Sequence, residues 1–194
     1  MAPSHYTELD TEQRQYLLQL ARRSIASRLA GVEPEPEPDT DIPELPADSH
    51  GVFVTLTLDG QLRGCIGAMQ PPCDLMREVP DIACRAAFRD PRFPPLSAAE
   101  LSKVNIEIAV LSTPRLINAG SRAELLIALQ PGVDGLLLED GVHRATFLPK
   151  VWAQLPERAQ FLGQLMTKAG LPSNHWSKTL RCSRYRSDSF AEQE

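Results

Sequence analysis

The chain has 194 residues, of which 42% are hydrophobic and 23% are charged. This length suits one domain or two small lobes, and the composition excludes a collagenous, fibrous or wholly disordered protein. No stretch approaches the roughly 18 apolar residues of a membrane-spanning helix, and the N-terminal residues lack the apolar segment of an export signal. We therefore expect a soluble cytoplasmic protein that does not bind membranes.

The formal net charge of −5 is unevenly distributed along the sequence. Residues 33–48 (EPEPEPDTDIPELPAD) hold seven of the 25 carboxylates, five prolines and none of the 20 basic residues. Alternating glutamate and proline cannot form a helix or pair in a sheet, so we expect an extended acidic, Pro-rich loop over residues 31–50. The remaining sequence has 20 basic against 18 acidic residues, and its charge does not exclude an anionic ligand.

Helical periodicity and capping residues predict several helices. Residues 11–29 form an amphipathic pattern, preceded by a capping box of Asp10 and Gln13. A second pattern covers 74–88 and contains Pro80, which is expected to kink or split the helix. Residues 90–95 are expected to form a rigid extended connection. Shorter helices are predicted after Ser97, from Ser121 to Leu129, over 149–155 and from Pro156 to Gly170.

Alternating apolar residues predict two hairpins and two single strands. In the first hairpin, residues 51–58 and 61–66 flank Asp59-Gly60, a dipeptide that favours tight turns. The second hairpin joins 135–140 to 142–147, and single strands are predicted at 104–110 and 179–186. Because strands and helices do not alternate strictly, we expect an α+β fold with a mostly antiparallel sheet and flanking helices.

The four cysteines, Cys65, Cys73, Cys84 and Cys182, form no CxxC pair. This spacing excludes a zinc knuckle and an iron–sulfur cluster, and free thiols are expected. Three of the histidines, His5, His50 and His175, have no ligand spacing either. We therefore expect no metal site and no cofactor.

The segment 62–67 (LRGCIG) is the strongest candidate for a functional site. Gly64 and Gly67 interrupt a predicted strand on both sides of Cys65, and glycine within a strand marks a bulge or a close approach to the backbone. Arg63 and Cys65 lie two residues apart and would share a face, where a guanidinium favours a reactive thiol. Alternatively, Cys65 is a small buried residue, because a two-residue turn pairs it opposite Val54.

A second charged group surrounds Pro91. Arg89, Asp90 and Arg92 could bind an anionic ligand through bidentate contacts, or they could form ion pairs that order their loop. Together with Arg63, Gly64, Cys65 and Gly67 they make up the predicted site.

Other polar residues have weaker patterns. Glu107 could supply a base from the third strand or belong to a solvated face. His143 could pair with Cys65 as nucleophile and base or be an ordinary exposed residue. The C-terminal segment combines basic and aromatic residues, as nucleic-acid-binding segments do; they are Trp176, Lys178, Arg181, Arg184, Tyr185 and Arg186. On a strand these side chains would divide between two faces, so nucleic acid is not the expected partner.

Three segments in order along the chain resemble the signature segments of the AMMECR family: LRGCIG (62–67), AAFRDPRFPPL (86–96) and RATFLPKVW (144–152). The family is named for a human Alport-syndrome and elliptocytosis chromosomal region, and its microbial members are called component A of the AmmeMemoRadiSam system. The resemblance implies a single domain over 1–194 with two unequal lobes, the larger from both chain ends and the smaller at about 68–103. It places the Cys65 motif near a cleft between the lobes and implies Memo-like and radical-SAM partners.

Three functions are compatible with these features. The first is an accessory module that binds a ligand or partner at the segment 62–67, without catalysis. The second is an enzyme, or thiol carrier, in which Arg63 activates Cys65. The third is nucleic-acid binding through the C-terminal segment. We rank the binding module first, because no general base of comparable signal accompanies the cysteine; the oligomeric state stays open.

Overall fold

The computed structural model describes residues 9–32, 43–45, 49–69 and 74–192. They form two compact units, which are treated separately: unit 1 comprises Met1–Leu111 with Asp188–Glu194, and unit 2 comprises Ser112–Ser187. Most of the acidic Pro-rich loop predicted over 31–50 lies outside the described residues. In the part of the chain that is described, no helix is long and apolar enough to cross a membrane.

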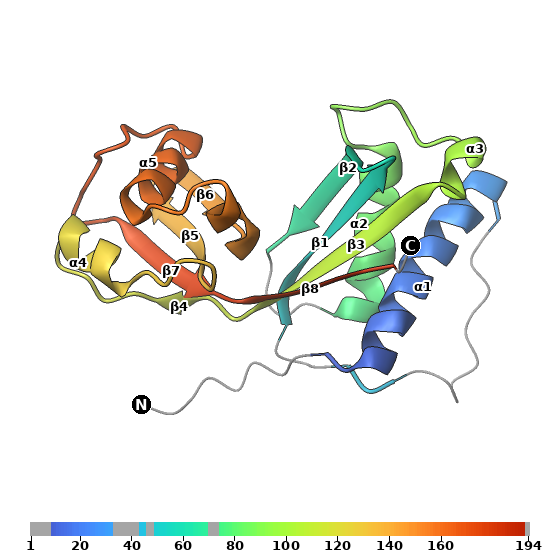
Figure 1. Ribbon diagram of the computed structural model, residues 1–194, viewed down its shortest axis with the longest axis horizontal. Helices are drawn as coiled ribbons and strands as arrows, with labels where there is room; N and C mark the ends of the chain where they lie inside the picture. Colours follow the sequence, from blue (N-terminus) through green and yellow to red (C-terminus); the bar gives the residue numbers. More distant parts are fainter. Residues whose placement is uncertain (1–8, 33–42, 46–48, 70–73, 193–194) are drawn as a thin grey trace. The chain divides into compact units, whose positions relative to one another are not determined.

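Unit 1 is a four-stranded sheet with two long helices on one face (Figure 1). The order of its strands is β2-β1-β3-β8, so β2 and β8 are the edge strands. The strands are β1 (Ser49–Leu58), β2 (Gln61–Ala68), β3 (Val104–Ser112) and β8 (Ser187–Ala191). The helices are α1 (Thr11–Ala30), α2 (Leu75–Phe88) and the short α3 (Ala98–Leu101).

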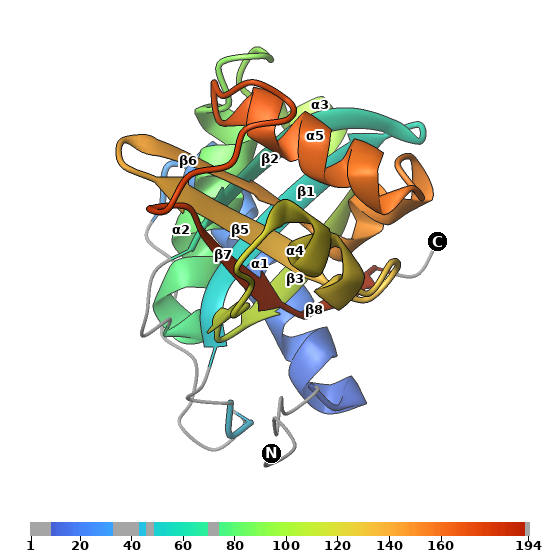
Figure 2. The ribbon, with the colours of Figure 1, turned by 90° about the vertical axis from the view of Figure 1, so that its left-hand side faces the viewer.

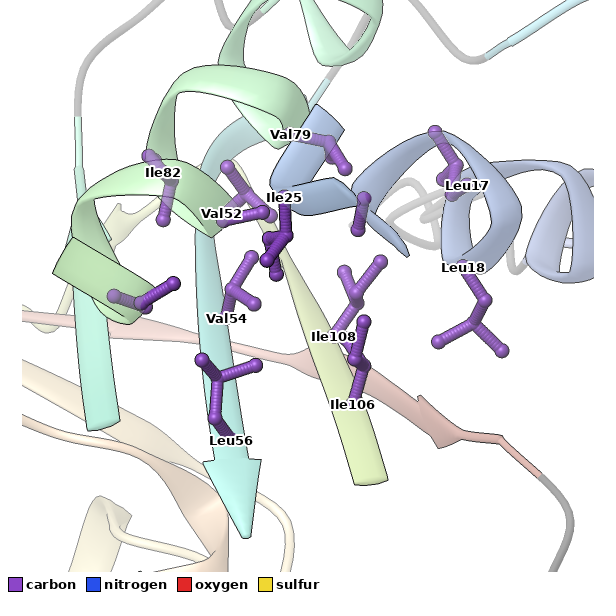
Figure 3. Packing of buried hydrophobic residues seen from close by; sticks show 14 of the residues in the cluster. Leu17, Leu18, Ile25, Val52, Val54, Leu56, Val79, Ile82, Ile106 and Ile108 are labelled. Carbon is purple, nitrogen blue, oxygen red and sulfur yellow. The ribbon is translucent and has the colours of Figure 1, made fainter. Parts of the chain in front are cut away.

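The core of unit 1 lies between the sheet and the helices α1 and α2. Alternate residues of β1 and β3 point toward the helices, as the strand period of two requires, and meet apolar residues of α1 and α2 (Figure 3). Those labelled in the figure are Leu17, Leu18, Ile25, Val52, Val54, Leu56, Val79, Ile82, Ile106 and Ile108. Burial of this continuous apolar surface is the main stabilising contribution to the unit.

Local sequence signals fix the ends of the helices in unit 1. The predicted capping box of α1 is confirmed, with the Gln13 N–H donating to the Asp10 carboxylate at 2.8 Å. The helix ends at Gly31 in the left-handed conformation, where glycine is favoured. Helix α2 continues through Pro80 as one helix, so of the two predicted effects, a kink or a split, the split does not occur. Its apolar face packs on α1 and the sheet, which outweighs the one backbone hydrogen bond that proline removes.

The first hairpin turns at Asp59 and Gly60 as predicted, and both residues have positive φ. Its register differs from the prediction, because Leu56 pairs with Gly64 while Thr57 pairs with Leu62. Arg63 is therefore the extra residue of a β-bulge. The bulge moves Cys65 from opposite Val54 to opposite Thr55, and such a one-residue shift places a side chain on the other face of the sheet.

Residues 90–95 are not the extended connection that was predicted. The Phe93 N–H donates to the Asp90 carbonyl at 3.1 Å, which closes a turn, and the Leu96 N–H then donates to the Ala87 carbonyl at the end of α2. The capping box of Ser97 and Glu100 at the start of α3 is confirmed. The loop from Arg89 to Ser97 is thus folded back onto unit 1.

Unit 2 contains a second four-stranded sheet, of order β4-β7-β5-β6. Helices α4 and α5 cover one face of it (Figure 2), and the buried side chains of β5 pack against them. The elements are β4 (Arg115–Leu116), α4 (Arg122–Ala128), β5 (Gly135–Asp140), β6 (His143–Phe147), the 3₁₀ helix η1 (Pro149–Ala153), α5 (Arg158–Lys168) and β7 (Arg181–Tyr185). The segment predicted as the last strand is β7, but β8 follows it in unit 1.

The α+β class is confirmed, with the described strands in two sheets. The division of the chain differs from the expected lobes. Residues 68–103 were expected to form a smaller lobe, but they belong to unit 1, where α2 packs on α1 and on the first hairpin. Unit 2 is instead the contiguous segment Ser112–Ser187.

Candidate functional site

Cys65 lies on the edge strand β2, on the face of the sheet that does not contact α1 and α2. Its side chain is half-buried and is adjacent to that of Thr55, whose hydroxyl donates to the cysteine sulfur at 3.5 Å. Val54 and Leu56, on either side of Thr55, point into the core of unit 1. The bulge at Arg63 is what brings the thiol to this face.

The loop after α2 binds the backbone of Cys65. The Cys65 N–H donates to Asp90 Oδ2 at 2.8 Å, and the Cys65 carbonyl accepts from Arg92 Nη2 at 3.1 Å. An edge strand leaves such groups without a strand partner. Asp90 and Arg92 therefore take the place of a neighbouring strand at this one residue.

Asp90 is a buried carboxylate that is fully used within the protein. Besides the Cys65 N–H, it accepts the Arg92 backbone N–H at 3.1 Å, Arg92 Nε at 2.9 Å and Arg92 Nη2 at 2.6 Å. The hydrogen bonds from the Arg92 guanidinium hold the pKa of Asp90 far below its usual range, although burial alone would raise it. The same contacts with Asp90, together with the neighbouring Cys65 side chain, raise the pKa of Arg92.

Arg92 is held at one side and exposed at the other. Its Nε and Nη2 atoms donate to Asp90 and Cys65, while 53% of the side chain is accessible to solvent. Among the described residues, no carboxylate or carbonyl accepts from Nη1. The guanidinium lies 5.5 Å from the centre of the Phe93 ring. We call Cys65, Asp90, Arg92 and Thr55 the Cys65–Arg92 site.

Arg63 does not activate Cys65 as predicted. Its Nε and Nη2 atoms donate to the Glu100 carboxylate at 2.7 and 3.2 Å, and Nη1 donates to the Pro94 carbonyl at 2.9 Å. Because Arg63 is the bulge residue, it does not share the alternation of the strand with Cys65. The Arg63 hydrogen bond and those from Ser97 lower the pKa of Glu100 to about 2. Through these hydrogen bonds, Arg63 holds the C-terminal end of the loop after α2 against β2.

Both glycines of the motif are needed for packing inside the protein. A Cβ on Gly64 would lie 2.3 Å from the Ala86 carbonyl oxygen, so here the backbone of α2 approaches the strand. A Cβ on Gly67 would lie 2.0 Å from the Phe53 ring. Glycine does mark a close approach, as the sequence indicated, but the approaching groups belong to the chain itself.

The sequence of this chain is similar to those of known proteins over most of its length. A family model described as AMMECR1 matches residues 18–190, a range that includes the whole Cys65–Arg92 site. The chain belongs to the AMMECR1 family. A relative from Methanosarcina acetivorans is 37% identical over 91% of this chain and 90% of its own. One from Methanosarcina barkeri is 38% identical over 91% and 89%.

The AMMECR1 fold also occurs in a solved structure. The crystal structure of an uncharacterised protein from Pyrococcus horikoshii matches 97% of this chain and 95% of its own, with a TM-score of 0.84 and 32% identity. The family and the fold are therefore established for nearly the whole chain.

Several other predicted residues of this AMMECR1-family chain lie outside the Cys65–Arg92 site. Arg89 is exposed at the C-terminal end of α2. Glu107 lies on β3, two strands away from β2 in the sheet order. His143 belongs to unit 2, where its Nδ1 atom is 2.8 Å from the Ala169 carbonyl oxygen.

The basic C-terminal segment does not form one basic, aromatic face. Tyr185 is buried, and its hydroxyl donates to the Phe147 carbonyl at 2.9 Å, so its ring cannot stack on a base. Arg184 pairs with the buried Asp134 at 3.5 Å. Arg181 and Arg186 are exposed, but the aromatic residue of the strand β7 is the buried Tyr185, so these two arginines have no exposed ring beside them on this strand.

One polar cluster was missed from the sequence because Asp140, at its centre, is 35 or more residues from the three residues that it binds. Asp140 accepts hydrogen bonds from Ser177 at 2.7 Å and Thr179 at 2.6 Å, and it contacts His175 Nε2 at 2.7 Å. These contacts lower the pKa of Asp140 to about 2, with Thr179 as the largest cause. The cluster joins the second hairpin to the loop after α5. Within the described ranges, no three potential ligand side chains could hold a metal ion.

Proposed function

We propose that this AMMECR1-family protein is a cytoplasmic accessory module that binds an anionic group of a ligand or partner protein at the Cys65–Arg92 site. The observation that carries the proposal is the state of Arg92. Its guanidinium is oriented by a buried carboxylate, yet 53% of the side chain is accessible. A cation held in this way loses little conformational freedom when it binds an anion.

The surroundings of Arg92 support binding rather than a purely structural role. Asp90 already receives hydrogen bonds from Cys65 and from three donors of Arg92, so the loop is ordered before any ligand arrives. No carboxylate or carbonyl of the described residues accepts from Nη1, so this donor can bind a carboxylate or phosphate oxygen of a ligand.

Family association supplies the candidate partners. AMMECR-type proteins are associated with Memo-like and radical-SAM proteins, and we propose that this chain binds one of them through the Cys65–Arg92 site. An exposed arginine with fixed geometry is a typical hot-spot residue of a protein interface.

The test measures binding of the Memo-like and radical-SAM proteins of the same organism by isothermal titration calorimetry. We expect Arg92→Gln to weaken binding about tenfold or more, because the charge-assisted hydrogen bond from Nη1 is lost. Cys65→Ser and the control Arg77→Gln, on an exposed part of α2, should bind as the wild type does. Equal binding by Arg92→Gln and the wild type, with both folded by circular dichroism, contradicts the proposal.

A second function is favoured by the position of Arg92, which donates to the carbonyl of Cys65 at 3.1 Å and so lies next to the residue that carries the thiol. In this alternative the thiol is a nucleophile or carries a group for a partner, and Arg92 takes the role that the sequence assigned to Arg63. The structure offers an internal reference, since burial raises the pKa of the Cys182 thiol to about 12.

The alternative is tested by alkylation with iodoacetamide at neutral pH, followed by mass spectrometry of each cysteine. A nucleophilic Cys65 should react faster than Cys84 and Cys182, and Arg92→Gln should slow Cys65 alone. If Cys65 reacts no faster than Cys84, the enzymatic alternative is abandoned and the binding module stands.

A further inference from the structure

A hollow with both polar and apolar side chains in its wall lies in unit 1, between the C-terminal halves of α1 and α2. Its volume is about 320 Å³, which is at the lower end of small-molecule sites. Side chains of α1 and α2 at helical spacing line the two sides. We call it the α1–α2 hollow. It shares no residue with the Cys65–Arg92 site.

The wall of the α1–α2 hollow is partly apolar. Phe88 packs with one side against the core of unit 1, and Pro80 extends the apolar wall along α2. On the opposite side Val32 is unusually exposed for its type, with 59% of its surface accessible. Together these side chains could cover the flat, apolar part of a small molecule.

The charges around the hollow are strongly unbalanced. Arg28, Arg85 and Arg89 line it with a single carboxylate, Asp81. Asp81 pairs with Arg85 at 3.4 Å, which leaves two positive charges. In the described part of the chain, no carboxylate forms an ion pair with Arg28 or Arg89. Cations are favoured near helix C-termini, but that preference does not account for a partly apolar hollow between these arginines.

We propose that the α1–α2 hollow binds a small organic phosphate monoester, with the phosphate between Arg28 and Arg89 and the apolar body against Phe88 and Pro80. A phosphate monoester carries a charge of about −1.5 to −2 at pH 7 and three strong acceptor oxygens. It therefore matches the two unbalanced guanidinium groups, whereas a carboxylate neutralises only one. Nothing in this site depends on Arg92 or Cys65.

Cys84 makes the proposal testable at the level of a single residue. Its half-buried thiol lines the hollow and donates to the Ser24 carbonyl at 3.5 Å. Burial raises the pKa of this thiol, although the Arg28 charge opposes the shift. Alkylation of Cys84 is therefore best followed at about pH 8.5, where a bound ligand protects it in proportion to occupancy.

The experiment follows alkylation of Cys84 and Cys65 by mass spectrometry in the presence of 1-naphthyl phosphate. At about ten times the dissociation constant, labelling of Cys84 should slow about tenfold. Cys65 should be labelled at an unchanged rate. Inorganic phosphate and 1-naphthoate should protect Cys84 less than 1-naphthyl phosphate, because the first lacks the apolar body and the second the full charge.

Variants of single arginines distinguish specific binding in the hollow from non-specific attraction by positive charge elsewhere on the protein. Arg28→Gln and Arg89→Gln should each weaken protection about tenfold or more, whereas Arg77→Gln, at the other end of α2, should leave it unchanged. Protection of Cys84 by 1-naphthol as strong as by the phosphate, or no protection at millimolar 1-naphthyl phosphate, overturns the proposal. Protection of Cys65 instead of Cys84 also overturns it, while leaving the function proposed for the Cys65–Arg92 site intact.

Discussion

Single charged residues in the signature segments stabilise the fold, although their residue types suggested ligand binding or catalysis. Arg63 and Asp90 are both charged and both largely buried. Arg63 is neutralised by Glu100 of α3, and Asp90 by Arg92 of the loop between α2 and α3. Removing one partner of a buried pair costs more than the pair itself contributes, because the other charge remains in a poorly solvated place. The residues that touch a ligand in our proposals, Arg28, Arg89 and Arg92, are instead the exposed ones.

Arg63→Ala should lower the free energy of unfolding by about 3 kcal/mol, because Glu100 and two carbonyl groups lose their donor. Urea denaturation followed by circular dichroism measures the change. Arg77→Ala, whose ion pair with Asp74 is exposed, should change stability by less than about 0.5 kcal/mol. Similar small effects for both variants would show that Arg63 is not a structural residue.

The Arg63–Glu100 pair should also make stability depend on pH. The pKa of Glu100 is about 2 in the folded protein against an ordinary value of 4.5. A carboxylate whose pKa is lowered in the folded protein stabilises the fold at pH values above its ordinary pKa. This contribution is lost as the pH falls from about 4.5 to about 2. Denaturation of the wild type and Glu100→Gln across this range should show the wild-type advantage shrinking toward low pH. A constant difference between the two proteins would contradict the assignment.

Gly64→Ala should be destabilising by about 1–3 kcal/mol, since the new Cβ meets the backbone oxygen of Ala86 at 2.3 Å. Gly120→Ala is the matched control, because there the nearest atom is the flexible Glu124 carboxylate at 3.5 Å. Thermal or urea unfolding compares the two. Equal stability of the two variants would mean that α2 can move away from β2 without loss.

At the scale of elements, the loop between α2 and α3 acts on the free edge of β2. Asp90 and Arg92 bind the N–H and carbonyl groups of Cys65, and Arg63 binds the carbonyls of Pro94 and Pro95. The edge strand is therefore covered by side chains rather than by a further strand, which protects it from pairing with another chain.

Asp90→Asn should weaken the contact between this loop and the edge strand β2 without changing the hydrophobic core. The amide side chain cannot accept as strongly from the Cys65 N–H and Arg92, so the Cys65 amide hydrogen should exchange at least about tenfold faster than in the wild type. Hydrogen exchange followed by NMR measures it, with the Val54 amide in the core strand β1 as the internal control. Unchanged exchange at Cys65 would show that the edge is protected by some other group.

The sequence predicts helices, turns and strands correctly where the signal comes from residues that are close together in the chain. The capping box at Asp10, the turn at Asp59-Gly60 and the apolar alternation of 104–110 each depend on residues within one element, and all are confirmed. The bulge at Arg63 is not encoded in the strand alone. The glycines indicated a bulge or a close approach somewhere in 62–67, but they did not indicate that Arg63 would be the bulged residue. Arg63 pairs with Glu100, which is 37 residues away, and sequence periodicity cannot predict such a contact.

Contacts between distant residues also explain why the sequence suggested Arg63, and not Arg92, as the neighbour of Cys65. Spacing along a regular strand placed Arg63 beside the thiol, but the bulge and Glu100 removed it. Arg92 took its place because the turn at 90–93 folds the loop back onto β2. Residues 89–92 were predicted as either ligand-binding or loop-ordering, and the structure shows the ordering role for Asp90 directly.

The whole molecule consists of two units that each have their own hydrophobic cluster. The cluster of unit 1 is built from α1, α2, β1 and β3, whereas that of unit 2 is built from α4, α5 and the strands β5 to β7. In unit 2, Trp152 stacks on Phe161 with ring centres 3.7 Å apart. Each cluster contains buried residues of one unit alone.

We therefore expect a core substitution to act mainly on its own unit. Leu165→Ala in α5 should cost about 2–5 kcal/mol and lower the exchange protection of amides in unit 2 more than in unit 1. Ile108→Ala in β3 should do the reverse. Native-state hydrogen exchange of both variants provides the measurement, and an equal loss of protection across both units would show that they unfold together.

The strand β8 makes unit 1 depend on two segments that are far apart in the sequence. Asp188 accepts from the Leu9 N–H at 3.0 Å and binds Arg14, so the segment after unit 2 anchors the start of α1. Unit 2 is contiguous and can close its sheet from its own residues, whereas β3 of unit 1 keeps an open edge until β8, which follows unit 2 in the sequence, pairs with it.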